Sequence, residues 1–512
     1  MKPTGLGHER VKSPDTACAR VELSSTERAG RRESAAYRQG VLSGIVVGGR
    51  ESRPQGEGPD GSTQPAQETR AGHAGSGNHV PTSLRGIANR ARESKHHRFR
   101  NLFGEVSVAL LTHCWHDLNK DAASGVDGLT AAQYAADLHG NIAALAERVK
   151  AGRYRAKLVR RVYIPKENGT QRPLGIPALE DKLVQLACAK LLSAIYEQDF
   201  LDCSHGYRPG RSAKEAVIGL GRELQSGHYH HVVEADIRGF FEHMDHDRVL
   251  AMLSERIDDR AFLGLIRKWL KAGILDTDGA VLHPDTGTPQ GGIVSPVLAN
   301  VYLHVALDLW FEHVVKPRCR GKALLCRYAD DFVCAFASKR DAERFFAVLP
   351  KRLETFGLQV APEKTQLVCF SRARPDPGTR IAFLGFELYW QRTFTGRVQL
   401  RRRTARKRLQ AATRGMTDWI KSHRHLPGRD FIKGLNRRLI GHYNYYGLHG
   451  NAGDLWRFYF AAVGVAFKWL NRRGGKRKSF TWDAFKRALK RLGVARPRLL
   501  TPRSAQREMV FA

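Results

Sequence analysis

Two adjacent aspartates, Asp330 and Asp331, interrupt a mostly apolar run, and this feature constrains the fold more than any other. Residues 323–327 and 332–337 read as two short strands joined by a tight turn, which places both acids at the tip of a hairpin. Like charges beside apolar strands are costly without a counter-charge, and a divalent cation supplies one. An ordinary polar turn is the alternative, because aspartate is common in turns.

A third acid, Asp236, favours the metal-binding interpretation. It lies near the end of an apolar strand predicted over 231–237. Nucleotidyl transfer needs two metal ions about 3.5–4 Å apart, and three carboxylates on two neighbouring strands can hold such a pair. Asp236, Asp330 and Asp331 are therefore the predicted metal ligands and catalytic residues. Two Mg²⁺ ions are expected, with Mn²⁺ as a substitute.

The charge of the chain indicates its partner. There are 84 Lys and Arg against 50 Asp and Glu in 512 residues, a formal net charge of +34. Residues 401–512 hold 28 basic and 5 acidic residues, which is +23 of that total. A large polyanion is the natural partner, and nucleic acid is the commonest one. A merely soluble basic surface is the simpler alternative.

Several other classes of protein do not fit the sequence. None of the eight cysteines forms a C-x-x-C pair, so neither a zinc site nor a disulfide framework is indicated. No stretch reaches the roughly 18 apolar residues of a membrane helix. The N-terminus lacks the pattern of a secretion signal. A cytoplasmic location without a membrane partner is expected.

Composition and periodicity divide the chain into four parts. Residues 1–80 are rich in Gly, Ser, Arg, Glu and Pro and are expected to be disordered. Residues 81–158 form a helical extension, residues 159–395 a mixed α/β part, and residues 396–512 a basic helical part. The helices expected with defined bounds cover 106–118, 130–150, 179–196, 247–270, 295–310 and 341–356, and the further strands cover 160–165 and 381–390.

Short motifs follow one another in order between about residues 100 and 390. They are GVDG at 125–128, YIPK at 163–166, RPLGIP at 172–177, SHGYRPGRS at 204–212, ADI at 235–237, TPQGGIVSP at 288–296, YADD at 328–331, PEKT at 362–365 and FLGF at 383–386. This order closely resembles the reverse transcriptase domain of bacterial group II intron-encoded proteins. The resemblance implies the α+β fold of a right-hand polymerase, with fingers, an antiparallel-sheet palm, a helical N-terminal extension and a helical thumb.

The resemblance also implies roles for residues near the aspartates. Lys166 and Arg172 are expected to contact the triphosphate of the incoming dNTP, and Gln290 to lie near the nucleotide or the template. Lys364 is expected near the catalytic carboxylates. Phe241 is expected to exclude ribonucleotides by a clash with the 2′-hydroxyl, and Ile237 joins the aspartates at the metal site. The alternatives are a surface ion pair for Lys166 and Arg172, a helix-entry loop around Gln290, a solvated loop lysine at 364, and a core phenylalanine at 241, with Phe240 in the gating role.

In the basic C-terminal part, the resemblance implies contacts to intron RNA. Dense Lys and Arg can neutralise a phosphate backbone, and aromatic rings beside them suit stacking on unpaired bases. The alternative for each tyrosine is a place in a helix–helix core. The residues expected to bind RNA are Arg401, Arg402, Arg403, Arg406, Lys407, Arg408, Arg437, Arg438, Tyr443 and Tyr445.

The function implied by the resemblance is an RNA-directed DNA polymerase that also helps its intron RNA to splice and move. Its partners would be group II intron RNA, an RNA template, a DNA primer and dNTPs. The alternatives are a catalytically retired RNA-binding splicing cofactor and a domesticated reverse transcriptase in phage defence. No cysteine follows Cys369, so the Cys/His endonuclease module of many relatives is not expected.

Overall fold

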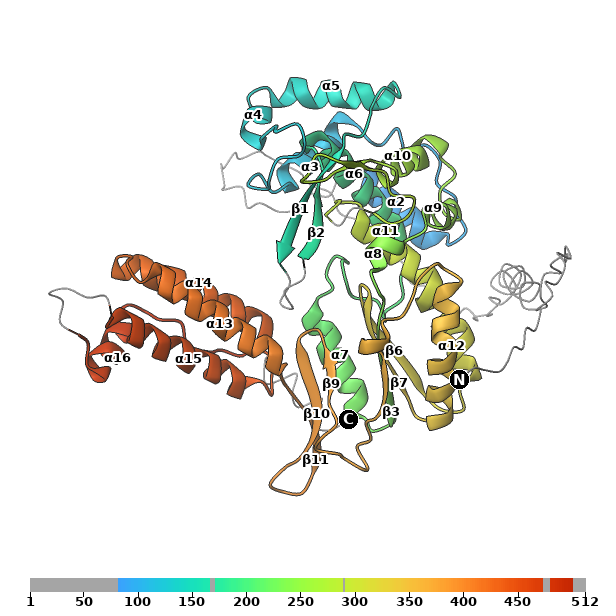
Figure 1. Cartoon of the computed structure of the whole chain (residues 1–512). Helices are drawn as coiled ribbons and strands as arrows, with labels where there is room; N and C mark the ends of the chain where they lie inside the picture. The colour runs from blue at the N-terminus through green and yellow to red at the C-terminus, as the bar shows by residue number, and fades with distance from the viewer. Residues whose placement is uncertain (1–81, 166–170, 289–290, 473–478, 501–512) are drawn as a thin grey trace, which may run out of the picture. The chain divides into compact units, whose positions relative to one another are not determined.

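The computed structural model describes residues 82–165, 171–288, 291–472 and 479–500 (Figure 1). The expectations for residues 1–80, Lys166 and Gln290 lie outside these ranges. The helices are α2 (Thr82–Glu93), α3 (Val108–Asp117), α4 (Ala131–Ala135), α5 (Leu138–Lys150), α6 (Leu179–Tyr196), α7 (Ala213–Gln225), α8 (Phe240–His243), α9 (His246–Ser254), α10 (Arg260–Leu270), α11 (Ser295–Leu303), α12 (Lys339–Glu354), α13 (Arg406–His423), α14 (Gly428–Tyr446), α15 (Ala452–Leu470) and α16 (Trp482–Arg491), with short π or 3₁₀ segments η1 (His304–Asp308), η2 (Phe311–Val315), η3 (Lys316–Arg318) and η4 (Pro362–Lys364).

Strands form three sheets in the described chain. They are β1 (Val159–Pro165), β2 (Gln171–Ile176), β3 (His231–Asp236), β4 (Ile274–Leu275), β5 (Val281–Leu282), β6 (Ala323–Tyr328), β7 (Asp331–Phe336), β8 (Gln366–Cys369), β9 (Ile381–Phe383), β10 (Phe386–Arg392) and β11 (Val398–Thr404). The sheet orders are β2-β1-β4-β5, β6-β7-β3-β8 and β11-β10-β9. All neighbours run antiparallel except the two-residue pairing of β1 with β4. The mixed helix and antiparallel-sheet class predicted from the sequence is confirmed.

Two helices expected from the sequence are each broken by an aspartate. The segment 130–150 divides into α4 and α5, because the Asp137 carboxylate accepts a hydrogen bond from Gly140 N at 3.1 Å and starts a new helix. The segment 247–270 divides into α9 and α10, where Asp259 accepts from Phe262 N at 3.0 Å. In both cases the expectation of one continuous helix was wrong, because the apolar spacing persists across the cap.

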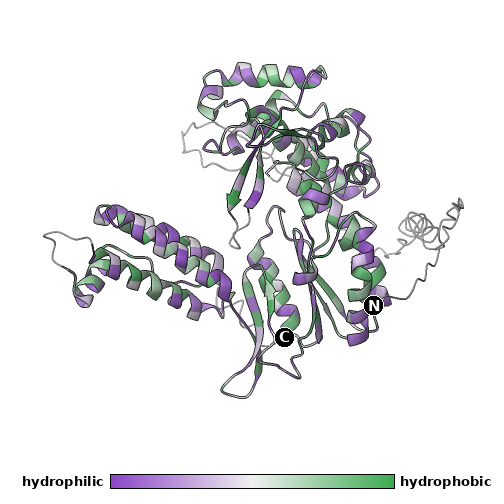
Figure 2. Ribbon diagram, viewed as in Figure 1, coloured by the Kyte–Doolittle hydropathy of each residue, from purple (hydrophilic) through white to green (hydrophobic). Residues whose placement is uncertain are grey.

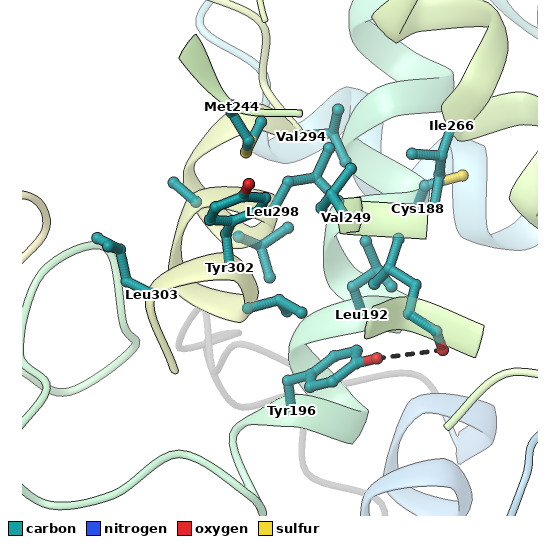
Figure 3. Packing of buried hydrophobic residues seen from close by; sticks show 14 of the residues in the cluster. Cys188, Leu192, Tyr196, Met244, Val249, Ile266, Val294, Leu298, Tyr302 and Leu303 are labelled. Carbon is teal, nitrogen blue, oxygen red and sulfur yellow. Dashed lines mark hydrogen bonds between the residues drawn. The ribbon is translucent and has the colours of Figure 1, made fainter. Parts of the chain in front are cut away.

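The N-terminal helices surround α6, which is buried along most of its length and has the bounds expected from the sequence. α2 and α3 pack against α6, and α3 also packs against α5. Figure 3 shows Cys188 and Leu192 of α6 together with Ile266 of α10 and Leu298 and Tyr302 of α11. The same apolar cluster includes residues of α2, α3 and α5, so it joins the helical extension to the part of the chain that holds the aspartates.

The four-stranded sheet β6-β7-β3-β8, called here the central sheet, separates two apolar layers. Alternating residues face opposite sides of a strand, so Val232 and Val333 pack with α7 while Val233 and Phe332 pack in the layer that includes α12. Figure 1 shows α7 and α12 on opposite faces of this sheet. Burial on both sides fixes the register of the strands.

The helix expected over 295–310 is regularly α-helical from Ser295 to Leu303. Two π-helical segments follow, η1 and η2, each with the wider i→i+5 hydrogen-bond pattern. η1 ends at Asp308, which is fully buried. A charged residue thus occupies a position inside an apolar layer.

The basic C-terminal part begins with a strand rather than a helix. β10 and β11 form a hairpin that ends at Thr404, so the boundary expected near residue 395 falls between two paired strands. The helices start at Arg406 and share a core of their own. Figure 2 shows many hydrophilic residues on α13 and α14 and more apolar ones on α15. No helix within the described residues is long and apolar enough to cross a membrane.

Candidate active site

β3 and β7 bring two of the predicted acids face to face. In the antiparallel register Asp236 pairs directly with Asp331, and paired residues project from the same face of a sheet. Asp330 lies in the turn between β6 and β7 that Tyr328 and Asp331 close. Ala329 in this turn has φ of 57°, a left-handed conformation that is rare for a residue with a side chain. The sequence elements carrying the three acids therefore meet at one end of the central sheet.

The electrostatics of these acids favour a bound cation. Burial and the neighbouring Asp236 and Asp330 charges raise the pKa of Asp331 to about 7. Burial also raises the pKa of Asp330, with a contribution from Asp236, while the positive charges of Arg172 and Lys364 oppose the rise. The charged forms of both carboxylates are thus disfavoured until more positive charge is supplied.

Lys364 supplies part of that charge. It ends the short segment η4, and its ammonium nitrogen donates to Oδ2 of Asp236. This hydrogen bond raises the pKa of Lys364. Ala361 N also donates to the backbone oxygen of Asp236 at 2.8 Å, which holds this segment against the end of β3. The expected proximity of Lys364 to the carboxylates is therefore present.

The donor chemistry of the three aspartates fits Mg²⁺, which prefers carboxylate oxygens. Their mutual repulsion and partial burial disfavour the charged carboxylates, and a bound cation would neutralise this negative charge. No three His, Cys, Asp or Glu side chains in the described ranges are spaced to share one metal ion. The side chain of Ile237 is buried and has no donor atom, so only its backbone carbonyl is chemically suited to a metal.

The SHGYRPGRS motif packs directly against the turn that carries Asp330. A Cβ on Gly206 would overlap the backbone nitrogen of Ala329, so only glycine permits this approach. Tyr207 follows with φ of 58° and is half exposed. Burial and the Asp330 charge raise the pKa of Tyr207, whereas Arg172 opposes the rise. Motifs separated by more than a hundred residues therefore meet at the aspartates.

A buried ion pair lies beside the turn and was not predicted from the sequence. Arg327 and Asp308 are both fully buried, and Arg327 donates to both carboxylate oxygens of Asp308 at 2.7 and 2.6 Å. Burial works to raise the pKa of Asp308, but Arg327 and His304 together oppose it, and the pKa lies below its ordinary value. The sequence did contain a sign of this pair. Two opposite charges stand at core positions, one in an apolar helix and one in an apolar strand.

Arg172 lies on β2, paired with Ile164 of β1. It is exposed, and its charge acts on the pKa values of both Asp330 and Tyr207. The structure thus brings Arg172 near the carboxylates, as a triphosphate contact requires. Gly291, next to the predicted Gln290, has φ of 117°, and a Cβ there would overlap the backbone oxygen of Gly175. The glycine-rich motif therefore lies against the RPLGIP segment.

Phe240 and Phe241 differ in their surroundings. Phe240 is among the largest fully buried side chains and packs edge-to-face on Tyr302, with ring centroids 6.2 Å apart. Phe241 is buried but more exposed than Phe240, and its backbone oxygen accepts a hydrogen bond from Thr288 N at 2.7 Å. Of the two rings, that of Phe241 is the more exposed, and the Phe241 backbone is hydrogen-bonded to Thr288 at the start of the TPQGG motif.

The basic residues that were expected to bind RNA differ in their exposure to solvent. Arg406, Lys407 and Arg408 are exposed in the first turn of α13, and Arg437 and Arg438 are exposed on α14. Arg437 also lines a hollow of about 480 Å³ together with the further residues Arg429, Ile432, Lys433, Asn436, Ile440 and Leu492. These cations are placed where a polyanion can reach them.

Other expected RNA contacts are partly or fully buried within the protein. Arg401 is partly buried on β11, and Arg403 donates to Glu387 at 2.8 Å. Arg402 is buried against Gly221, and Tyr443 is fully buried in the core of the C-terminal helices. The expectation of RNA contacts for Arg402 and Tyr443 is corrected, because strand alternation and helix packing turn both side chains inward.

Tyr445 keeps part of its ring accessible. It is stacked on Phe386, with centroids 6.1 Å apart, and its hydroxyl donates to the Leu384 oxygen at 3.1 Å. The side chain is 41% exposed. These contacts anchor the ring at the β9–β10 connection, and Tyr446 packs against it with centroids 4.7 Å apart.

Comparison with known proteins agrees with this site. The family model described as reverse transcriptase (RNA-dependent DNA polymerase) matches residues 164–388, which include all three aspartates. Protein YkfC of Escherichia coli (strain K12) is 32% identical over 307 residues, 54% of this chain and 78% of YkfC. The group II intron-encoded protein LtrA of Lactococcus lactis subsp. cremoris is 45% identical over 157 residues, 30% of this chain and 26% of LtrA.

A more distant similarity extends to plants. Nuclear intron maturase 4, mitochondrial, of Arabidopsis thaliana is 25% identical over 138 residues, 26% of this chain and 16% of that protein. The match thus spans most of YkfC but only about a quarter of LtrA. The ordered motifs, the paired aspartates and these similarities together show that the chain belongs to the family of group II intron-encoded reverse transcriptases and maturases.

Proposed function

We propose that this chain copies RNA into DNA at the site formed by Asp236, Asp330 and Asp331, as a right-hand polymerase. The central sheet is the palm, β1 and β2 belong to the fingers, and α13–α16 form the thumb. The observation that carries the proposal is the direct pairing of Asp236 with Asp331 beside the Asp330 turn. Three acids at one sheet end, with positive charges at its rim, suit a metal and triphosphate site.

The metal site would use the carboxylates of Asp236, Asp330 and Asp331, with the backbone carbonyl of Ile237. Two Mg²⁺ ions bound there would lower the pKa of the primer 3′-hydroxyl and neutralise the triphosphate leaving group. Mn²⁺ carries the same charge and would replace them. The three aspartates would orient the reacting groups, and the raised pKa values of Asp330 and Asp331 would fall once positive charge is bound.

The surrounding residues would bind and select the nucleotide. Arg172 offers a planar guanidinium to the triphosphate, and Lys166 a second cation from the β1–β2 connection. Lys364 hydrogen-bonds Asp236, and it would turn to a phosphate oxygen when metal and dNTP bind. Phe241 would close the space of a 2′-hydroxyl, and Gln290 would contact the nucleotide or the template.

The basic C-terminal helices would hold RNA during copying and during splicing. The exposed Arg406, Lys407 and Arg408 suit a phosphate backbone because they contact it without reading sequence. Relatives named as an intron-encoded protein and an intron maturase support intron RNA as the partner. The complex with this RNA would be a cytoplasmic ribonucleoprotein. A DNA primer, an RNA template and dNTPs complete the proposed substrates.

Primer extension on an RNA template tests the proposal. The purified chain is given a DNA primer, dNTPs and Mg²⁺, and is compared with the double variant Asp330→Asn/Asp331→Asn. Extension by the unchanged chain alone would support the assignment. No extension by either protein, with tight RNA binding retained, would favour a splicing cofactor without polymerase activity. Extension by both proteins would show that these aspartates are not the catalytic site.

A further inference from the structure

The buried guanidinium of Arg327 uses all of its hydrogen-bond donors beside the catalytic turn. Two of its N–H groups bind Asp308, at 2.7 and 2.6 Å. The others reach Asn300 Oδ1 at 3.1 Å, Ala329 O at 3.0 Å and Ser204 Oγ at 2.7 Å. Arginine has five such donors, and five acceptors surround it here. One side chain thus ties together three segments: the helix formed by α11 and η1, the turn after β6, and the loop that holds Ser204.

The hydrogen bond to Ala329 is the one that touches the turn. Ala329 directly precedes Asp330, and its backbone is in the disfavoured left-handed region. Such a conformation persists only when its surroundings hold it. Arg327 binds the Ala329 carbonyl, while Gly206 packs on the Ala329 nitrogen from the other peptide.

The same network also fixes Gly206. Asn300 Nδ2 donates to the Gly206 oxygen at 2.7 Å, and Asn300 Oδ1 accepts from Arg327. Asn300 lies on α11 and Asp308 on the π-helical segment that follows. The widened helix therefore carries both the carboxylate and the amide that hold the turn and its packing partner.

We propose that Arg327, held in place by Asp308, is a positioning residue for the aspartates of the turn. A buried ion pair contributes little net stability, because desolvation offsets most of the attraction. The network instead fixes a strained turn so that Asp330 and Asp331 face Asp236 in one geometry. This inference rests on the proposed polymerase function, since it concerns how its catalytic carboxylates are held.

The test replaces the pair by apolar residues of similar size, Arg327→Met/Asp308→Leu. Such exchanges often leave stability unchanged or improved. We expect the variant to fold and to bind primer–template and dNTP with near-normal Kd and KM. We expect kcat in primer extension to fall about 10-fold or more, because a misplacement of about 1 Å is costly in catalysis. Amide hydrogen exchange of residues 328–331 should become faster in the absence of substrate.

Arg256 provides a matched control. It is also a buried arginine, bonded to Asp199 at 2.9 Å and to the carbonyls of Ser94, Lys95 and His97, and none of its hydrogen bonds within the described residues reaches the turn. Arg256→Met should lower the melting temperature but leave kcat per folded molecule and exchange at 328–331 unchanged. A folded Arg327→Met/Asp308→Leu variant with normal kcat and normal exchange would overturn the proposal.

A milder variant keeps the test decisive if the double variant does not fold. Ser204→Ala removes one acceptor of Arg327 and leaves the ion pair intact. We expect a few-fold loss of kcat and faster exchange at 328–331, with little change in melting temperature. Unchanged kcat and exchange would reject the positioning role. Failure of the unchanged chain to extend a primer would instead reject the proposed function itself.

Discussion

Asp236 at the end of β3 and Asp331 at the start of β7 are direct partners in the antiparallel register of the central sheet. Two like charges on one face of a partly buried sheet end repel each other, and this raises the pKa of Asp331 beyond the effect of burial. The pairing explains both why the site needs a cation and why its protonation changes near neutral pH.

The pairing predicts how metal-free stability depends on pH. The pKa of Asp331 is about 7 in the folded protein against 3.8 for an unperturbed aspartate. The folded state therefore binds this proton more tightly than the unfolded state, and the free energy of unfolding falls as pH rises from about 4 to about 7. Asp331→Asn should stabilise the metal-free protein at pH 8 by on the order of 1 kcal/mol, measured by urea unfolding with a chelator.

The same pair of proteins, measured at low pH, provides the control. At pH 4 Asp331 of the unchanged chain is largely protonated in the folded state and is therefore neutral, as the asparagine of the variant is. The difference in unfolding free energy between the two proteins should then largely disappear. Primer extension by the unchanged chain should decline as pH falls, because protons and metal ions compete for Asp331, and the decline should shift to lower pH as the Mg²⁺ concentration rises. Equal stability of the two proteins at pH 8 would show that Asp331 carries no such penalty.

Phe241→Ala should relax discrimination against ribonucleotides. Removing the ring opens the space that a 2′-hydroxyl would occupy, while the edge-to-face contact of Phe240 with Tyr302 keeps the core in place. The measurement is the ratio of kcat/KM for dNTP and NTP in primer extension, expected to fall by at least about 10-fold. Phe240→Leu is the matched core control and should leave this ratio unchanged. A Phe241→Ala variant with normal selectivity would place the gate elsewhere.

Gly206→Ala should damage the catalytic turn without touching any acid. A Cβ at this position would overlap backbone atoms of Ala329, which cannot move aside as a flexible side chain can. We expect kcat to fall by about 10-fold or more while RNA affinity is retained. Gly219→Ala on α7 is the control, because open space surrounds that position and alanine favours a helix. Comparable activity of the two variants would show that the turn tolerates displacement.

Charge reversal at Arg406, Lys407 and Arg408 should weaken RNA binding. The logarithm of the binding constant should also depend less steeply on the logarithm of salt concentration, with the slope smaller by about 0.7 for each phosphate that is no longer neutralised. Arg340→Glu/Arg344→Glu on α12 is the control, because it alters net charge at exposed residues outside the proposed RNA surface. A salt slope equal to that of the unchanged chain would mean that the first turn of α13 faces away from RNA.

The sequence alone determined the elements whose patterns are local. The bounds of α6, the strands on either side of the aspartate turn and the mixed fold class followed from apolar periodicity, because that signal depends only on nearby residues. The ordered motifs likewise indicated the family and the three acids. Helix breaks at Asp137 and Asp259 were missed because the apolar face continues across each cap.

Only the tertiary structure decided which charges meet and which side chains face inward. Arg402 and Tyr443 look like RNA contacts in a basic sequence, yet packing buries both. The pairing of Arg327 with Asp308 joins residues 19 positions apart, and the close packing of Gly206 on Ala329 joins residues on different segments. Burial and long-range packing depend on how the whole chain folds, so no local pattern could reveal how the catalytic turn is held.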